Sequence, residues 1–193
     1  FKTITCGDGG MLVSDDTDLY QRAFAMHDQG HSPLRSGVEV GARPMLGLNL
    51  RMTEVQGAVL VAQLRKLDRI RSHLRENRDL VWSLLKGLPG IGFRELPDRA
   101  GDLGTHLVVV FPTAEVARAV TGALDSITLD HSGWHVYSHM ENLLDQRTVT
   151  GRGCPFDCDC HYDARTRYEA GMLPQTDALL ARSMSFAIGV VDP

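Results

Sequence analysis

The sequence lacks the features that mark membrane, nucleic-acid-binding and disulfide-rich proteins. No apolar run approaches the ~20 residues needed to span a bilayer, and runs such as 107–111 are far shorter. Twenty basic and 24 acidic residues give a net charge of −4 without long runs of one sign, so neither a nucleic-acid footprint nor a membrane-surface patch is evident. The chain has only four cysteines, which favours a reducing cytoplasm over a disulfide scaffold.

The sequence also starts without an initiator Met or a signal peptide. It begins Phe1-Lys2-Thr3-Ile4 and passes into a Gly-Asp-Gly-Gly turn at 7–10, and its last apolar run stops at Pro193 without a closing element. We therefore expect the chain to begin, and to end, partway through a fold. Glycines at 7, 9 and 10 permit positive φ angles, so a sharp turn is expected between the lysine and a strand at 10–14.

Apolar spacing predicts the elements of the first part of the chain. A helix over 17–28, capped by the turn at 14–16, precedes a loop at 30–50 whose length and glycine content suggest a functional role. Thr53 and Gln56 fit a capping box at the start of a very long helix, or two in succession, over 53–86. The first half of that stretch is apolar nearly all round and is predicted to be buried, whereas its second half is amphipathic.

A small α+β unit is predicted to begin near residue 88, after the Gly-Leu-Pro-Gly turn. Strands are expected at 91–96 and 106–111, and a helix at 114–124. Beyond 130 the pattern predicts an aromatic loop, a cysteine cluster, a helix near 176–183 and a strand at 184–191. The predicted domains are therefore residues 1–75 and 76–193.

The cysteine cluster invites a zinc interpretation. Tetrahedral structural zinc commonly uses two spaced pairs of ligands, whereas the candidates here fall within eight residues with no second pair: Cys154, Cys158, Cys160 and His161. We therefore predict no metal site, and reduced cysteines in a surface loop. Zinc binding is the alternative, and elemental analysis for stoichiometric zinc tests it.

Four motifs in unbroken order resemble those of the DegT/DnrJ/EryC1/StrS family of pyridoxal-phosphate-dependent sugar aminotransferases. They are residues 2–11, 14–16, 28–31 and 47–56, and the resemblance runs over about 1–90 and more loosely to the end. Within the family the tail, at 134–137, 153–156 and 188–193, looks most like the members that aminate an eight-carbon keto-sugar acid, the 8-amino-3,8-dideoxy-manno-octulosonate transaminases. The resemblance implies an α/β fold of the aspartate aminotransferase type, fold type I, with the end of the large domain followed by the small C-terminal domain.

The resemblance also implies roles for individual residues. Lys2 stands where the family keeps the lysine that forms a Schiff base with pyridoxal 5'-phosphate and then shuttles a proton to the substrate carbon. Asn49 matches a residue that reaches the cofactor phosphate of the other subunit, which implies a homodimer with shared active sites. Arg51 would anchor either an anionic substrate group or the loop itself, since a guanidinium suits both.

An aromatic loop supplies the remaining candidates. His135 and Tyr137 lie where the family places residues near the substrate, with His139 a weaker candidate, although a lone histidine is often merely packed or solvated. Trp134 is expected in the core. The acidic partner of the pyridine nitrogen, the ring stacked on the cofactor, a serine and the first phosphate contacts are expected before residue 1.

The implied reaction transfers an amino group from glutamate or glutamine to the keto group of a sugar, in amino-sugar, surface polysaccharide or antibiotic biosynthesis. The expected partners are the small-molecule keto-sugar and amino donor, with no nucleic acid and no membrane, in the cytoplasm. One alternative is a non-catalytic binding or scaffold protein of the same fold. Another is a sugar dehydratase with the same cofactor, in which the family replaces this lysine by histidine, and Lys2 argues against it.

Overall fold

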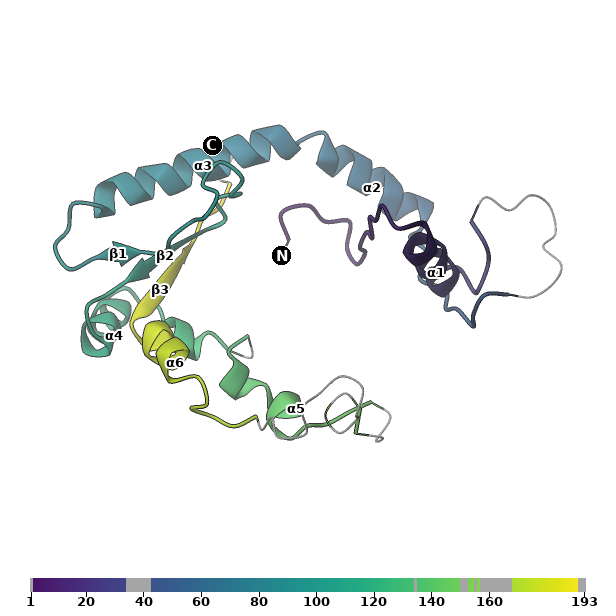
Figure 1. Ribbon diagram of the computed structural model, residues 1–193. Coiled ribbons are helices and arrows are strands. Elements are labelled where there is room, and N and C mark those ends of the chain that lie inside the picture. Colours follow the sequence, from purple (N-terminus) through teal and green to yellow (C-terminus); the bar gives the residue numbers. More distant parts are fainter. Residues whose placement is uncertain are drawn as a thin grey trace. The chain divides into compact units, whose positions relative to one another are not determined.

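The structure is a computed structural model that describes residues 2–33, 43–133, 135–149, 153–154, 156 and 168–190 (Figure 1). The chain divides into two compact units, Phe1–Ile70 and Arg71–Pro193, and each is described by itself. Several predictions fall outside the described residues, namely the centre of the loop at 34–42, Trp134, Cys158, Cys160, His161 and the end of the last predicted strand. In the described ranges, no helix is both long and apolar enough to cross a membrane.

The helices of the first unit begin as the sequence predicts. Helix α1 spans Thr17–His27, and the Asp16 carboxylate accepts hydrogen bonds from the amides of Asp18 and Leu19, which are otherwise unpaired at a helix start. Helix α2 spans Glu54–Leu64 and carries the predicted capping box between Thr53 and Gln56. The stretch predicted at 53–86 forms two helices in succession, because a turn separates α2 from α3, Leu67–Leu85.

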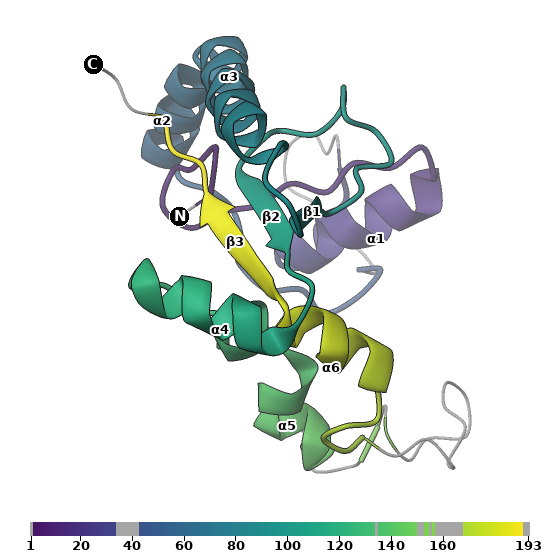
Figure 2. The ribbon, with the colours of Figure 1, turned by 90° about the vertical axis from the view of Figure 1, so that its left-hand side faces the viewer.

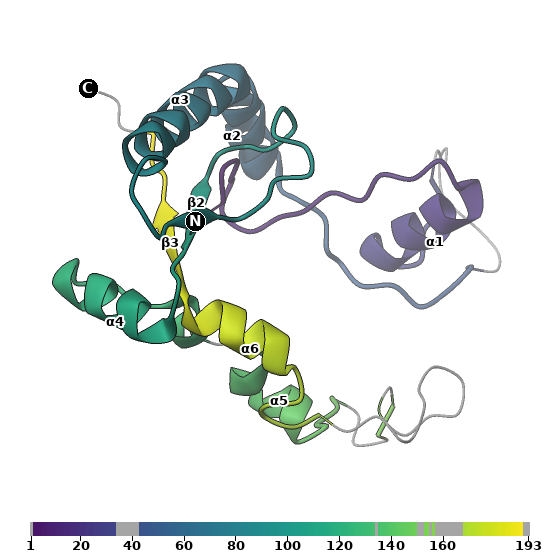
Figure 3. The same ribbon diagram turned by 60° about the vertical axis from the view of Figure 1, so that its left-hand side comes forward.

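Two extended segments connect the elements of the first unit, one before α1 and one leading into α2 (Figure 3). The strand predicted at 10–14 is wrong, since these residues are extended but belong to no sheet. Met11 and Val13 are 80% and 85% exposed. A strand requires a neighbour that exchanges backbone hydrogen bonds with it, and no strand of the described residues lies alongside.

The predicted burial of α2 is also wrong. None of its residues is buried, and Val55 is 74% exposed. Only the face that carries Gln56, Leu60 and Gln63 is partly covered. The apolar composition of α2 was a sound indicator of helix, but burial depends on chain that packs against every face, and the described residues cover one.

The second unit is built on a three-stranded antiparallel sheet in the order β1-β2-β3 (Figure 2). Its strands are β1 (Gly92–Phe93), β2 (His106–Val110) and β3 (Ser183–Ala187), all within the predicted strands apart from Ser183 and all shorter. Val109 pairs with Phe93 on one side and Met184 on the other. Helices α4 (Ala114–Ala123) and α6 (Pro174–Ala181) pack beside β3, and the core contains Val109, Phe111, Ala117 and Met184.

Between α4 and α6 the chain forms short helical turns where the sequence predicted loop. They are the 3-10 turns η1 (Leu129–His131) and η2 (Tyr137–His139) and the single-turn helix α5 (Glu141–Leu144). Elements of one turn carry too few residues to show a helical period, so apolar spacing could not have revealed them.

Candidate active site

Lys2 lines a cavity of about 230 Å³ in the first unit. The walls are the Gly-rich turn that follows Lys2 and α2, which contributes the partly covered Leu60 and the exposed Leu64. Met52, the residue before the N-cap of α2, and Cys6 also line the cavity. The structure thus places an amine, a thiol and a thioether around a small space whose far side is apolar.

The Gly-rich turn is held against the start of α2. The Gln56 side-chain amide donates to the Asp8 carbonyl oxygen at 2.9 Å, so one residue serves both the capping box and the turn. Gly7 has φ of +92°, as predicted. Gly9 and Gly10 do not adopt positive φ. The reason for glycine at position 9 is instead space, because a Cβ there would lie 3.1 Å from the Met52 Sδ and 3.3 Å from the Cys6 Sγ.

Asn49 and Arg51 lie on the extended segment that pairs with the end of α1. Asn49 forms an antiparallel bridge with Asp28, and the amides of Leu48 and Leu50 donate to the Met26 and His27 carbonyl oxygens at 2.8 and 2.9 Å. Neither Asn49 nor Arg51 lines the Lys2 cavity. Their predicted contacts with cofactor and substrate therefore stay predictions.

The Arg51 guanidinium forms an ion pair with the Asp28 carboxylate. The Asp28 side chain is 6% exposed and that of Arg51 is 44% exposed. This contact ties the segment at 48–51 to α1, which is the loop-anchoring role that the sequence left open beside a substrate role.

In the second unit Tyr137 is an anchor. Its hydroxyl donates to Asp177 Oδ2 at 2.9 Å and accepts from the amides of Gly171 and Leu173 at 3.1 and 3.2 Å. These contacts fix η2 against the residues that lead into α6. They describe a structural role for the phenol, and the predicted contact with substrate stays a prediction.

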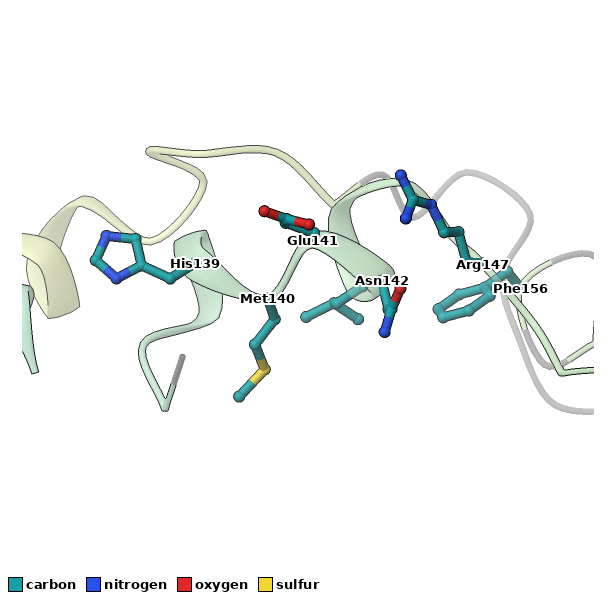
Figure 4. A pocket seen from close by; sticks show the side chains of 7 residues that line it. His139, Met140, Glu141, Asn142, Arg147 and Phe156 are labelled. Carbon is teal, nitrogen blue, oxygen red and sulfur yellow. The ribbon is translucent and has the colours of Figure 1, made fainter. Parts of the chain in front are cut away.

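The aromatic loop borders a cavity of about 540 Å³ (Figure 4). His139 lines it, together with Glu141, Asn142 and Leu143 of α5, and with Arg147 beyond the helix. His135 and Tyr137 do not line it, and His135 is exposed. His139 therefore lies at this cavity, whereas His135, which the resemblance favoured, does not.

The prediction of reduced cysteines is wrong for Cys154, which is disulfide-bonded, whereas Cys6 is free. Three of the four candidate metal ligands, Cys158, Cys160 and His161, lie outside the described residues. Among the described residues no group of three potential metal ligands is found.

Sequence reasoning missed Asp28, Cys6 and Met52. A signal existed for Asp28, because it caps the C-terminus of α1, where the helix dipole disfavours a carboxylate unless a cation lies nearby. Cys6 and Met52 had no such signal, since they meet only through the packing of the turn on α2.

Comparison with solved structures defines the class of fold. The chain is similar to S. venezuelae DesV, with a TM-score of 0.58 and 21% identity over 92% of this chain and 40% of that one. It is also similar to 3-amino-5-hydroxybenzoic acid synthase, with a TM-score of 0.53 and 23% identity over 90% of this chain and 42% of that one. The chain therefore has part of the aminotransferase fold of type I, a mixed α/β architecture, as predicted.

The particular family follows from the sequence match. Residues 1–190 match the DegT/DnrJ/EryC1/StrS aminotransferase family, and the chain belongs to it. GDP-perosamine synthase of Caulobacter vibrioides is 29% identical over 129 residues, which cover 67% of this chain and 33% of that protein. L-glutamine:scyllo-inosose aminotransferase of Streptomyces griseus is 31% identical over 145 residues, which cover 67% and 34%. The chain thus spans about a third of the length of these relatives.

Pyridoxal phosphate is the cofactor of aminotransferases of this family. The residues around Lys2 fit its aldehyde end, because an amine lines a cavity whose glycine turn leaves room for close approach. The described residues of that cavity include no acidic or aromatic side chain for a pyridine ring. In a cofactor site built here, Lys2 would supply the amine.

Proposed function

We propose that this protein is a pyridoxal-phosphate-dependent aminotransferase that transfers an amino group from glutamate or glutamine to the keto group of a sugar or a related cyclic polyol. The observation that carries the proposal is the position of Lys2 in a cavity walled by the Gly-rich turn and α2, in a chain of the aminotransferase family. The chain has two other lysines. Lys86 lies 4.7 Å from the centre of the Trp82 ring, and Lys66 lies in the turn after α2.

The bound cofactor supplies an aldehyde and an electron sink. Lys2 would hold the cofactor through its amine and, once free, would carry the proton of the amino transfer at its Nζ atom. Leu60 and Leu64 would give the amine apolar neighbours on one side. Asn49 contacts the cofactor phosphate of a second subunit, so the proposal includes a homodimer with shared sites.

The substrate class rests on the relatives. One relative named above is a synthase of GDP-perosamine and the other an aminotransferase of scyllo-inosose, so a ring ketone with several hydroxyls is the proposed acceptor. The narrower resemblance to transaminases of an eight-carbon keto-sugar acid gains no support from these relatives. Within the proposal, Arg51, His135 and Tyr137 face the substrate, and residues 1–75 and 76–193 are parts of the large and small domains.

The proposed location is the cytoplasm, and the disulfide at Cys154 stands against it, because disulfides are rare in reducing compartments. Titration of thiols in protein purified without reductant measures this directly. A full complement of four reactive thiols after unfolding supports the cytoplasm, and a deficit of two supports an oxidising compartment.

The test of the activity is amino transfer by the whole protein with cofactor, glutamate or glutamine, and a panel of keto-sugars. We expect Lys2→Ala to lower kcat by at least about a thousandfold, because the variant loses the nucleophile and the proton carrier at once. Lys66→Ala is the matched control and should retain activity. Equal activity of the Lys2 variant would contradict the proposal and favour the scaffold alternative, whereas loss of water from the sugar in place of amination would favour the dehydratase.

A further inference from the structure

A second, smaller cavity lies in the second unit, beside the sheet. It encloses about 130 Å³ and is lined by three arginines, Arg78 of α3 with Arg94 and Arg99 of the segment after β1, and by the rings of Trp82 and Phe93. None of these residues belongs to the candidate active site. Three guanidinium groups around so small a cavity repel one another unless an anion lies between them.

Arg78 is the buried member of this arginine cavity. Its side chain is 4% exposed, its Nε donates to Asp79 Oδ1 at 3.1 Å, and its Nη1 donates to Asp102 Oδ2 at 2.6 Å. The third nitrogen, Nη2, has no acceptor among the described residues. Because no fully buried side-chain nitrogen among the described residues lacks a partner, Nη2 keeps some accessible surface, and Arg78 lines the cavity. Its hydrogens need an acceptor there.

The other two guanidinium groups are close by. Arg99 donates to the same Asp79 Oδ1 at 2.7 Å, so Arg78 and Arg99 converge on one carboxylate oxygen. The Arg99 Cζ also lies 4.8 Å from the centre of the Trp82 ring, which orients it. Arg94 is fixed through its backbone, whose amide donates to the Val108 carbonyl oxygen at 3.1 Å. Its guanidinium makes no ion pair within the described residues.

The local charge is positive. The lining carries three guanidinium groups and no carboxylate, because Asp79 and Asp102 pair with Arg78 and Arg99 from outside it. Glu95 and Asp98 adjoin in sequence but do not line the cavity. Guanidinium groups donate in pairs to phosphate oxygens, so this lining suits a phosphate anion.

We propose that the arginine cavity binds a phosphate group, whose oxygens accept hydrogen bonds from Arg78 Nη2, Arg94 and Arg99. The cavity encloses about 130 Å³, and the proposed ligand is inorganic phosphate or the terminal phosphate of a small metabolite. This site is independent of the cofactor site and of the proposed activity. Phosphate binding that depends on these arginines identifies the site.

Isothermal titration calorimetry of the whole protein with inorganic phosphate, at constant ionic strength, tests the proposal. Arg94→Gln is the test variant, since the Arg94 guanidinium makes no ion pair within the described residues. We expect it to raise the phosphate Kd about tenfold, because one charge-assisted hydrogen bond is lost. Arg94→Lys should recover part of the affinity. Arg118→Gln is the control, because Arg118 is an exposed arginine of α4 with a single partner, Glu115, and this variant should bind phosphate as the unmodified protein does.

A second titration with methyl phosphate separates the two sources. Binding of both ligands indicates the phosphate of a metabolite, and binding of inorganic phosphate alone indicates the free ion. Phosphate binding at the cofactor site would persist in the Arg94 variant. Persistence of all phosphate binding in Arg94→Gln, or no phosphate binding in the unmodified protein, would overturn the proposal.

Discussion

At the residue scale, the ion pair of Asp28 and Arg51 organises the first unit. Asp28 is 5% exposed and lies at the C-terminal end of α1, where the partial negative charge of the helix opposes a carboxylate. Burial makes an unpaired charge there costly. Arg51 supplies the compensating cation, and the pair fixes the segment that carries Asn49.

Removal of the Arg51 guanidinium should therefore lower the stability of the protein. We expect Arg51→Leu to lower the free energy of unfolding by about 2 kcal/mol, because the buried Asp28 carboxylate loses its ion pair with Arg51. Urea denaturation measures it. The double variant Asp28→Asn with Arg51→Leu should recover part of the loss, and two independent, additive losses would show that the pair does not hold the segment.

Tyr137 allows the anchoring and substrate roles to be separated. The variant Tyr137→Phe keeps the ring and removes the three hydrogen bonds of the hydroxyl, so we expect a loss of about 2 kcal/mol in unfolding free energy. Because the hydroxyl bonds to protein groups, the Tyr137 ring and not its hydroxyl would face the substrate, so the KM for the keto-sugar should stay unchanged. A raised KM with unchanged stability would instead assign the hydroxyl to the substrate.

Asp79 predicts an acid dependence of stability. Burial would raise the pKa of Asp79, but the hydrogen bonds and charges of Arg78 and Arg99 outweigh it and hold this pKa below its ordinary value. A depressed folded-state pKa stabilises the protein above the unfolded pKa, near 4, and that stability is lost as the pH falls through the folded pKa. In urea titrations between pH 5 and pH 3, Asp79→Asn should therefore lose less stability than the unmodified protein. An identical pH profile would refute this assignment.

At the element scale, the end of α1 and the segment at 47–50 are packed backbone against backbone. A Cβ at Gly47 would overlap the Ala25 carbonyl oxygen and the Gly30 amide nitrogen. We expect Gly47→Ala to lower the free energy of unfolding by at least about 2 kcal/mol, as measured by urea denaturation. Gly57→Ala, within α2, is the control. It meets no atom within 4 Å and should stabilise by about 0.5–1 kcal/mol, so a similar loss in both variants would contradict the packing argument.

The sequence predicted elements where the signal was local. The Asp16 cap of α1 and the Thr53 capping box depend on residues within one turn, and both are confirmed. The strand at 10–14 and the burial of α2 failed because they depend on chain that packs from elsewhere. Asp28 pairs with Arg51 across 23 residues, and the convergence of Arg78 and Arg99 on Asp79 arises from folding alone, so no spacing rule could have indicated either.

At the scale of the whole molecule, the chain is about a third of the length of the curated relatives named above. Lys2 and Asn49 belong to the first unit, and Tyr137 and the arginine cavity to the second. If Asn49 acts across a subunit interface, each active site needs residues from two chains.

Mixing of variants tests that arrangement. Lys2→Ala and Asn49→Ala homodimers should each have low activity, while heterodimers should contain one intact site. Mixed after unfolding and refolding together, the two variants should recover about a quarter of the unmodified activity, since half of the dimers are mixed and each has one site of two. Recovery should be absent when they are mixed without exchange of subunits. No recovery after exchange would place Asn49 in the same subunit's site.

The most direct measurement of the central claim is the location of the cofactor on the chain. Borohydride reduction of the protein purified with pyridoxal phosphate, followed by proteolysis and peptide mass spectrometry, fixes the cofactor to the lysine that holds it. The account predicts the added mass on the peptide containing Lys2 and on neither Lys66 nor Lys86. Labelling of either of those residues, with Lys2 unmodified, would contradict it.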